Sequence, residues 1–248
     1  MTMAIYERHK AGDKAGNQAE RQHSVRWLAL LVLGLGLFVG VVDSSVVNVA
    51  TPAMQQEFQA TNAQMLLVVM VYSLVFASFL LLFGKAGHGV GLRRLMAVGA
   101  GLFGLSSLLI ALAPSIEFVN GIRAVTGLAA AMGGATGLAL VHSIFKGPDR
   151  ALAFGIWGAI ASLGAVLGPA LGGWAVTYYS WRWAFAINVP ICLFIVIGAY
   201  LWITEVKHES TSPIDYAGAA IIGLGLFTII LALVYEPSWG WWAAKADL

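Results

Sequence analysis

Seven long apolar runs constrain this chain more than any other feature of its sequence. A helix needs about 20 predominantly apolar residues to cross roughly 30 Å of hydrocarbon. The runs cover residues 27–50, 64–83, 95–114, 121–143, 152–176, 184–204 and 216–236. They are apolar on every side instead of alternating, and a lipid-embedded helix satisfies its backbone polar groups internally. The pattern therefore predicts an all-α, polytopic transmembrane helical bundle.

The composition excludes several other classes of protein. Hydrophobic residues make up 59% of the chain and charged residues only 10%, whereas about a quarter of a soluble domain is charged. A net charge of +2 leaves no basic surface for a nucleic-acid partner. The single cysteine, Cys192, lies in an apolar run and is interpreted as a buried, inert thiol. His88 and His142 have no second ligand at metal spacing, so no metal site is predicted.

The basic residues predict how the chain is oriented. If the N-terminus is cytoplasmic, eleven lysines and arginines lie on that side, and only Arg182 and Lys245 lie outside. Basic residues concentrate on the cytoplasmic side of membrane proteins. We therefore expect a multi-pass protein of the inner (plasma) membrane, with its N-terminus in the cytoplasm and its C-terminus outside.

The polar breaks between the runs divide the chain into segments. The polar residues before the first run are followed by no cleavage site, so that run is interpreted as a retained span. We expect a disordered cytoplasmic arm at 1–26, a six-span bundle at 27–204, a cytoplasmic linker at 205–215, a seventh span at 216–236 and an extracytoplasmic tail at 237–248.

Four local patterns carry a family resemblance. Residues 42–52 read VDSSVVNVATP, and residues 120–127 read NGIRAVTG. Residues 164–173 read GAVLGPALGG, which fits the pattern GxxxGPxxGG, and residues 181–190 read WRWAFAINVP. In this order, over about 27–242, the chain resembles the major facilitator superfamily and in particular its fourteen-span drug/proton antiporters.

The resemblance implies the N-terminal six-helix half of a major facilitator fold plus one extra span. It also implies proton-coupled multidrug efflux of amphipathic or cationic compounds, driven by the proton gradient without a cofactor, and no enzyme activity. The implied partners are the lipid bilayer, these compounds, protons, and a second copy or a C-terminal half. Transporters of this kind place their site between two halves. The alternative is therefore a truncated, non-transporting remnant, or a subunit that needs a second half or a homodimer.

A seven-helix receptor or an intramembrane enzyme is a third class to compare. A retinal protein needs a lysine in its last span, and residues 216–236 contain none. An intramembrane serine hydrolase needs a serine with a histidine partner, and His142 beside Ser143 at the end of a span is weak support.

Two ionisable residues are the leading candidates for a functional site. Asp43 lies inside an apolar run, where carboxylates generally face a cavity or a partner. It is either a site for a proton or a cationic substrate, or a structural aspartate bonded to the hydroxyls of Ser44 and Ser45. For Arg123, the resemblance implies a role in proton coupling. The alternative is an arginine whose head group reaches the outer interface.

Three further groups of candidates complete the expected site. The antiporter motif, which we expect to bend the fifth span and pack it closely against a neighbour, consists of Gly164, Gly168, Pro169, Gly172 and Gly173. The candidate cavity-lining residues are Asn48, Tyr72, Trp157 and Asn188. The cytoplasmic gating loop comprises Gly84, His88, Gly91, Arg93 and Arg94, with His88 where the family has an acidic residue.

Overall fold

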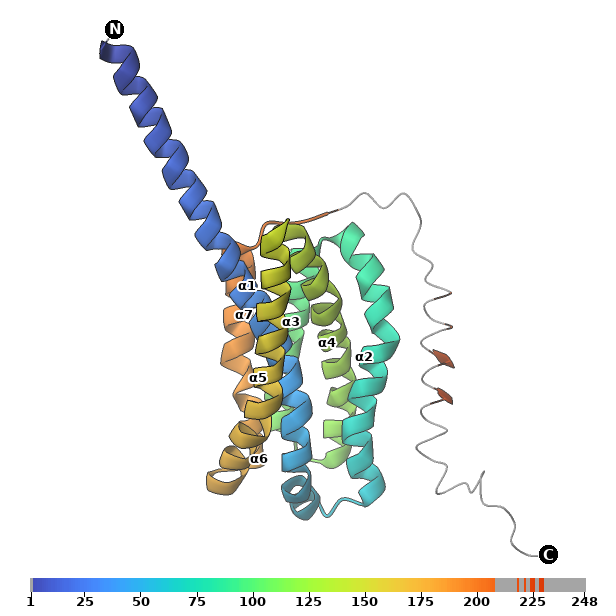
Figure 1. Cartoon of the computed structure of the whole chain (residues 1–248). Helices are drawn as coiled ribbons and strands as arrows, with labels where there is room; N and C mark the ends of the chain where they lie inside the picture. Colours follow the sequence, from blue (N-terminus) through green and yellow to red (C-terminus); the bar gives the residue numbers. More distant parts are fainter. Residues whose placement is uncertain (1, 208–217, 219–220, 222–223, 226–227, 230–248) are drawn as a thin grey trace, which may run out of the picture.

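The computed structural model describes residues 2–207 and positions 218, 221, 224, 225, 228 and 229. Within residues 2–207 the elements are helices that run side by side (Figure 1). They are α1 (Thr2–Phe58), α2 (Asn62–Val90), α3 (Leu92–Ala111), α4 (Ile116–Ile144), α5 (Pro148–Tyr178), α6 (Trp181–Ala186) and α7 (Asn188–Trp202). The expected tail lies outside the described residues, as does most of the expected linker and seventh span.

Six segments of the described chain are long and apolar enough to span a membrane. They are His23–Phe58, Asn62–Gly87, Leu92–Ala111, Ile116–Ile144, Pro148–Tyr178 and Trp181–Trp202. Each overlaps one of the first six predicted runs, and α6 and α7 together form the sixth. Polar caps extend the helices beyond their apolar centres. Thr61 and Gln64 form a capping box at the start of α2, and Ser115 accepts a hydrogen bond from the Phe118 amide at the start of α4.

Helix α1 begins at Thr2, so the structure has helix where the sequence predicted a disordered arm. Figure 1 shows this N-terminal part projecting away from the bundle. Its sequence includes several alanines, lysines, arginines, glutamates and glutamines, which all favour the helical conformation. A polar composition excludes burial of this segment, but it does not exclude a solvated helix.

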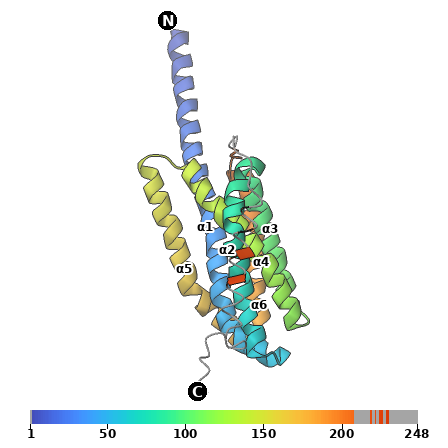
Figure 2. The same cartoon turned by 90° about the vertical axis from the view of Figure 1, so that its right-hand side faces the viewer.

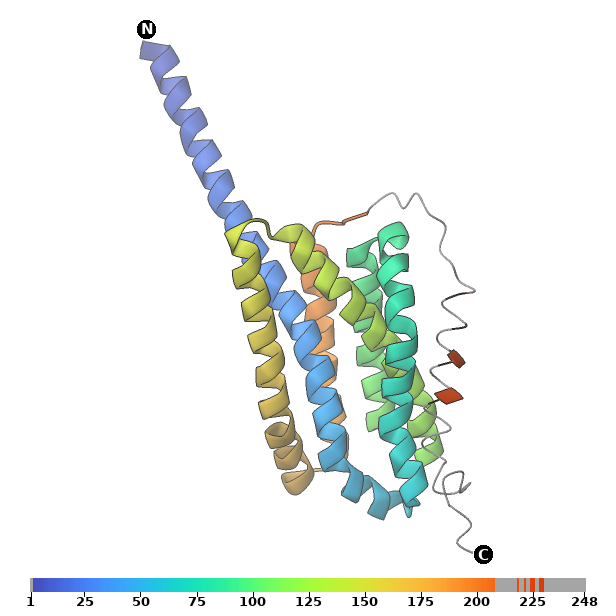
Figure 3. The same cartoon turned by 45° about the vertical axis from the view of Figure 1, so that its right-hand side comes forward.

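Helix α1 occupies the middle of the bundle. In Figure 3 it lies between α5 on one side and the pair of α2 and α4 on the other, and Figure 2 shows α5 set apart from α2, α3 and α4. Helix α1 contacts α5, α7 and α4, while α3 packs against α4 and α7. Helices α2 and α4 pack closely at Gly127, where a Cβ would lie 2.5 Å from the Tyr72 carbonyl oxygen. Close approach through small residues is the usual way helices associate in lipid.

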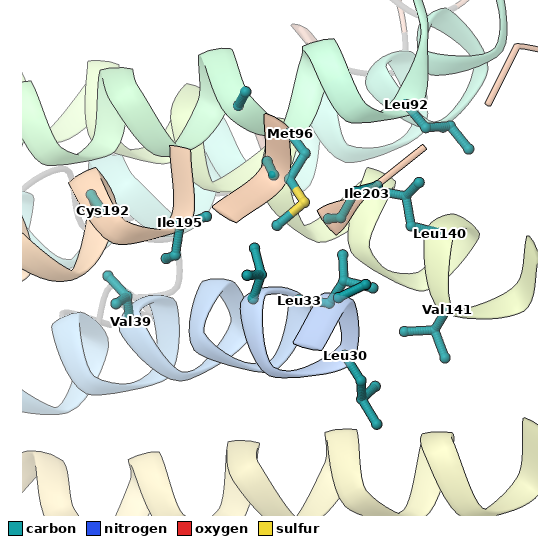
Figure 4. Close-up of a cluster of buried hydrophobic side chains, with 14 of the residues drawn as sticks. Leu30, Leu33, Val39, Leu92, Met96, Leu140, Val141, Cys192, Ile195 and Ile203 are labelled. Atoms are coloured by element: carbon teal, nitrogen blue, oxygen red, sulfur yellow. The ribbon is translucent and has the colours of Figure 1, made fainter. Parts of the chain in front are cut away.

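Three clusters of buried apolar side chains form the core of the described bundle. The first, shown in Figure 4, includes Leu30, Leu92 and Ile203. The second includes Met54 and Trp181, and the third includes Val46 and Ala175. We name the two ends of the bundle after a charged residue at each: the Arg93 end, with the α2–α3 connection, and the Glu57 end, with the α1–α2 connection. Helix α1 runs from the Arg93 end to the Glu57 end, and α7 runs the opposite way.

Candidate functional site

A buried ion pair lies in the middle of the bundle. The Arg123 Nη1 on α4 lies 2.6 Å from the Asp43 Oδ2 on α1, and the two side chains are 1% and 0% exposed. The Arg123 Nε also donates to the Val68 carbonyl oxygen at 2.9 Å. The guanidinium carbon lies 4.3 Å from the centre of the Tyr72 ring. Two helices therefore hold the arginine of α4: α1 contributes a carboxylate, and α2 contributes a carbonyl and an aromatic face.

In this geometry Asp43 is not bonded to the hydroxyls of Ser44 and Ser45, and Arg123 does not reach the outer interface. The Ser44 hydroxyl donates to the Gly40 carbonyl and the Ser45 hydroxyl to the Val41 carbonyl, each at 3.0 Å, so these serines are occupied by their own helix. Arg123 is buried and does not extend to an interface. Removing one partner of such a pair would leave an uncompensated charge in an apolar interior, which is strongly unfavourable.

An apolar cavity of about 420 Å³ lies next to the ion pair. Its walls come from α1 to α5 and α7, and include Tyr72, Phe76 and Trp157. Neither Asp43 nor Arg123 lines it. Tyr72 does, and its ring also covers the Arg123 guanidinium, so this side chain lies between the cavity and the ion pair. The cavity is within the size range of small-molecule sites, which are mostly apolar and aromatic.

Two of the four predicted cavity-lining residues lie elsewhere. Tyr72 and Trp157 line the cavity as predicted, and the Trp157 indole also donates to the Leu33 carbonyl at 3.2 Å. Asn48 is exposed and donates to the Ser44 carbonyl of its own helix at 3.3 Å. Asn188 is buried away from the cavity and donates to the Ser107 hydroxyl of α3 at 3.4 Å. The prediction was wrong for these two because an apolar run does not reveal how its helix is rotated.

The predicted antiporter motif places α5 against α1. Gly164, Gly168 and Gly172 repeat every four residues and are buried on one face of α5. A Cβ at Gly168 would lie 2.7 Å from the Ser45 Cβ, so only glycine permits this helix separation. Pro169 is exposed and lies within the continuous helix α5, and Gly173 faces Val49 at a wider distance. The close packing is present; the expected bend stays a prediction.

A model of the Major Facilitator Superfamily matches residues 33–244, which is most of the chain. The chain belongs to the major facilitator superfamily. It is similar to the multidrug resistance protein Stp of Mycobacterium tuberculosis (strain ATCC 25618 / H37Rv), with 35% identity over 86% of this chain and 40% of that protein. It is also similar to the puromycin resistance protein pur8 of Streptomyces alboniger, with 34% identity over 87% of this chain and 43% of that protein.

A solved structure supports the fold of this superfamily member. The crystal structure of peptide transporter POT in complex with sulfate matches with a TM-score of 0.64 and 19% identity, over 86% of this chain and 46% of that chain. At this identity the match concerns the fold alone. The chain spans about two fifths of the length of the curated relatives described above. Its helices and its family make it a multi-pass membrane protein.

The Arg93 end of this superfamily member carries a charged clasp that includes a residue missed in the sequence. Glu205 follows α7 and accepts a hydrogen bond from the Arg93 amide at 3.0 Å, at the start of α3. Its other carboxylate oxygen lies 3.5 Å from Arg93 Nε and 3.6 Å from Arg94 Nε. Gly91 has a φ of +111°, and a Cβ there would lie 2.6 Å from a Glu205 oxygen. A carboxylate is also favourable at a helix N-terminus.

The predicted gating loop is shorter in the structure than in the sequence analysis. Gly84 and His88 are part of α2, so the connection to α3 is reduced to Gly91. The prediction of a loop from Gly84 was wrong because the glycines of this stretch are tolerated in a helix whose neighbours support it. Glu205 could have been suspected from charge alone, since an acidic residue at the end of a span faces an arginine pair on the same side.

The Glu57 end has a second clasp. The Arg182 Nη1 lies 2.7 Å from one Glu57 oxygen, while the other accepts from the Trp181 indole at 2.7 Å. The Arg182 Nη2 donates to the Ala113 carbonyl oxygen at 3.2 Å. These bonds tie α1, α6 and the α3–α4 connection together. The sequence contained the WRW pattern, but it did not show that Glu57, far away in the chain, is its partner.

Proposed function

We propose that this chain forms the N-terminal half of a proton-coupled multidrug exporter of amphipathic or cationic compounds. The observation that carries the proposal is the buried Asp43–Arg123 pair beside an apolar, aromatic-lined cavity. Two relatives named for multidrug and puromycin resistance support the class of cargo. The driving force is the proton gradient and needs no cofactor.

The ion pair supplies a way to bind and release a proton. A carboxylate in an apolar interior is disfavoured in its charged form, whereas a nearby cation favours it. Asp43 and Arg123 compensate each other's charge in this interior, and a proton bound to Asp43 would release Arg123 from its carboxylate partner. Because Tyr72 contacts Arg123 and also lines the cavity, movement of the arginine changes the wall that a bound compound touches. Proton and cargo can thereby exclude each other.

One bundle provides only one wall of a transport pathway. Transporters rock two halves about a site at the middle of the membrane. Helices α2 and α5 expose large apolar side chains such as Phe79, Leu163 and Val166, which would suit lipid or a second bundle. The proposal therefore concerns an assembly that contains this bundle together with a C-terminal half or a second copy. It would lie in the inner membrane with the Arg93 end cytoplasmic, as the basic residues predict.

The test is dye efflux in vesicles that contain such an assembly. We expect efflux of a lipophilic cation to collapse when the pH gradient is dissipated, and to be absent in Asp43→Asn at every pH. The matched control is Asp149→Asn, which removes an exposed carboxylate whose nearest cation, Arg26, lies 3.9 Å away. Normal, pH-dependent efflux in Asp43→Asn would reject the assignment of Asp43.

A further inference from the structure

Several buried side-chain atoms have no hydrogen-bond partner within the described part of the chain, and two of them are oxygen atoms on the neighbouring helices α1 and α7. These two are the Asp43 Oδ1 and the Asn188 Oδ1, and each residue is 1% exposed. A buried acceptor left without a donor is unfavourable by roughly 1–3 kcal/mol. Native proteins rarely keep two such atoms without a reason, so their relative position is informative.

The helix register places Asp43 and Asn188 at the same depth. Gly198 of α7 packs on Val32 of α1, because a Cβ at Gly198 would lie 2.6 Å from a Val32 methyl group. From this contact, Asp43 is eleven residues along α1 and Asn188 is ten residues back along the antiparallel α7. At 1.5 Å per residue, these steps are roughly 16 Å and 15 Å in the same direction.

The two residues also lie on facing sides of their helices. Val32, Val39 and Asp43 follow the spacing of one helix face, and so do Asn188, Cys192 and Ile195. Figure 4 shows Val39 on α1 and Cys192 on the neighbouring α7, in one buried cluster. The next turn of each helix carries Asp43 and Asn188. The amide of Asn188 is held through its Nδ2 by Ser107, which leaves its carbonyl oxygen as the free end.

We propose that Asn188 accepts a hydrogen bond from Asp43 when Asp43 carries a proton. Ionised Asp43 is bonded to Arg123 through Oδ2. A proton taken from water onto Oδ1 makes the carboxyl neutral, so the ion pair with Arg123 becomes a weaker hydrogen bond from the guanidinium to a neutral acceptor. It also gives Oδ1 a hydrogen to donate to the Asn188 carbonyl. Release of the proton to water reverses each change. Asn188 is thus a positioning residue for the protonated state, and Ser107 holds it in place.

The inference rests on the proposed function only in taking Asp43 as the group that binds the proton. Other polar or charged groups around it are few. Arg123 and Tyr72 face it from α4 and α2, and Cys192 lies one turn away on α7. The remaining charged residues of the helices between positions 26 and 202 lie toward the bundle ends; they are Arg26 and Glu57 on α1, Lys85 on α2, Arg93 and Arg94 on α3, Glu117 on α4, Asp149 and Arg150 on α5, and Arg182 on α6.

The experiment is a pH titration of the full chain in lipid by infrared difference spectroscopy. The band of the protonated Asp43 carboxyl is identified by its loss in Asp43→Asn. In Asn188→Leu we expect the midpoint of this band to fall by about half a pH unit or more, which is roughly threefold weaker proton binding. The band should also move to higher frequency, because its hydroxyl has lost an acceptor. Leucine makes the site less polar, which alone would raise the midpoint, so a fall isolates the lost hydrogen bond.

A second variant and a control test the hydrogen bond without introducing the leucine side chain of Asn188→Leu. Ser107→Ala releases the Asn188 amide, so the midpoint should fall in the same direction by a smaller amount. Ser106→Ala is the matched control, because Ser106 is also buried on α3 but donates to the Phe103 carbonyl at 2.9 Å; its midpoint should equal that of the wild type. An unchanged or raised midpoint in Asn188→Leu would overturn the role of Asn188 and leave the proton site intact. Absence of any band from a protonated Asp43 would overturn both the role of Asn188 and the assignment of Asp43 as the proton site.

Discussion

At the scale of single residues, the most unusual feature of this bundle is its buried ion pair. Asp43 and Arg123 are almost fully buried, and their mutual attraction balances the cost of taking two charges out of water. Their pairing could not be read from the sequence, because 80 positions separate them. The sequence did identify both residues as candidates, since ionisable side chains inside apolar runs are rare. What it could not supply was the rotation of α1 and α4 that turns them toward each other.

We predict that breaking the pair destabilises the bundle more than removing it. Arg123→Leu leaves the buried Asp43 carboxyl without its cation and its hydrogen-bond donor, so it should lower the free energy of unfolding by about 3–5 kcal/mol. The double variant Asp43→Asn, Arg123→Leu should recover much of this loss. Cys192 is the only cysteine and is buried, so thermal unfolding in detergent can be followed with a thiol-reactive dye. A double variant as unstable as Arg123→Leu would contradict the account.

At the scale of the elements, glycine spacing decides which helices meet. The sequence predicted the close packing of α5 from its repeated glycines, and α1 is the helix it meets. The boundaries were predicted less well, because capping residues and tolerated glycines extend the helices beyond their apolar centres. Asn48 and Asn188 were wrongly predicted to line the cavity for the same kind of reason, since hydropathy carries no information on helix rotation in a segment that is apolar all round.

Substituting Gly168 tests the packing of α5 on α1. Leucine at this position must displace the Ser45 side chain, so Gly168→Leu should lower the melting temperature clearly and separate the two helices. Gly155→Leu is the control, because it lies on the same helix and a Cβ there would meet nothing within 4 Å. The Cys192 dye assay serves for both. Equal melting temperatures for the two variants would show that the glycine face does not hold α5 in place.

The clasp at the Arg93 end gives a prediction for the connection between α2 and α3. Gly91→Ala introduces a side chain at a φ of +111° and against the Glu205 carboxylate, so it should destabilise the bundle by about 1–2 kcal/mol. Gly89→Ala, an exposed position with nothing within 4 Å, should have little effect. Chemical unfolding of the two variants compares them directly, and equal stabilities would argue against a strained, occupied turn at Gly91.

At the scale of the whole molecule, the fold was the most predictable feature. Six spans, their order and their family all follow from apolar runs and four short patterns, because lipid leaves so few alternatives for the backbone. The apolar cavity and its relation to the ion pair were not predictable, since they depend on how α1, α2 and α4 cross. The arrangement is asymmetric: α1 holds the carboxylate, α4 the arginine, and α2 supplies the tyrosine that separates them from the cavity.

The central claim is that Asp43 links proton movement to export. The most direct test is the proton flux that accompanies addition of a lipophilic cation to vesicles containing an assembly of this bundle, measured with a pH-sensitive dye. The account predicts a cation-dependent proton flux in the wild type and in Asp149→Asn, and none in Asp43→Asn, even where that variant still binds the cation. A proton flux of wild-type size in Asp43→Asn would contradict the claim and place the proton site elsewhere.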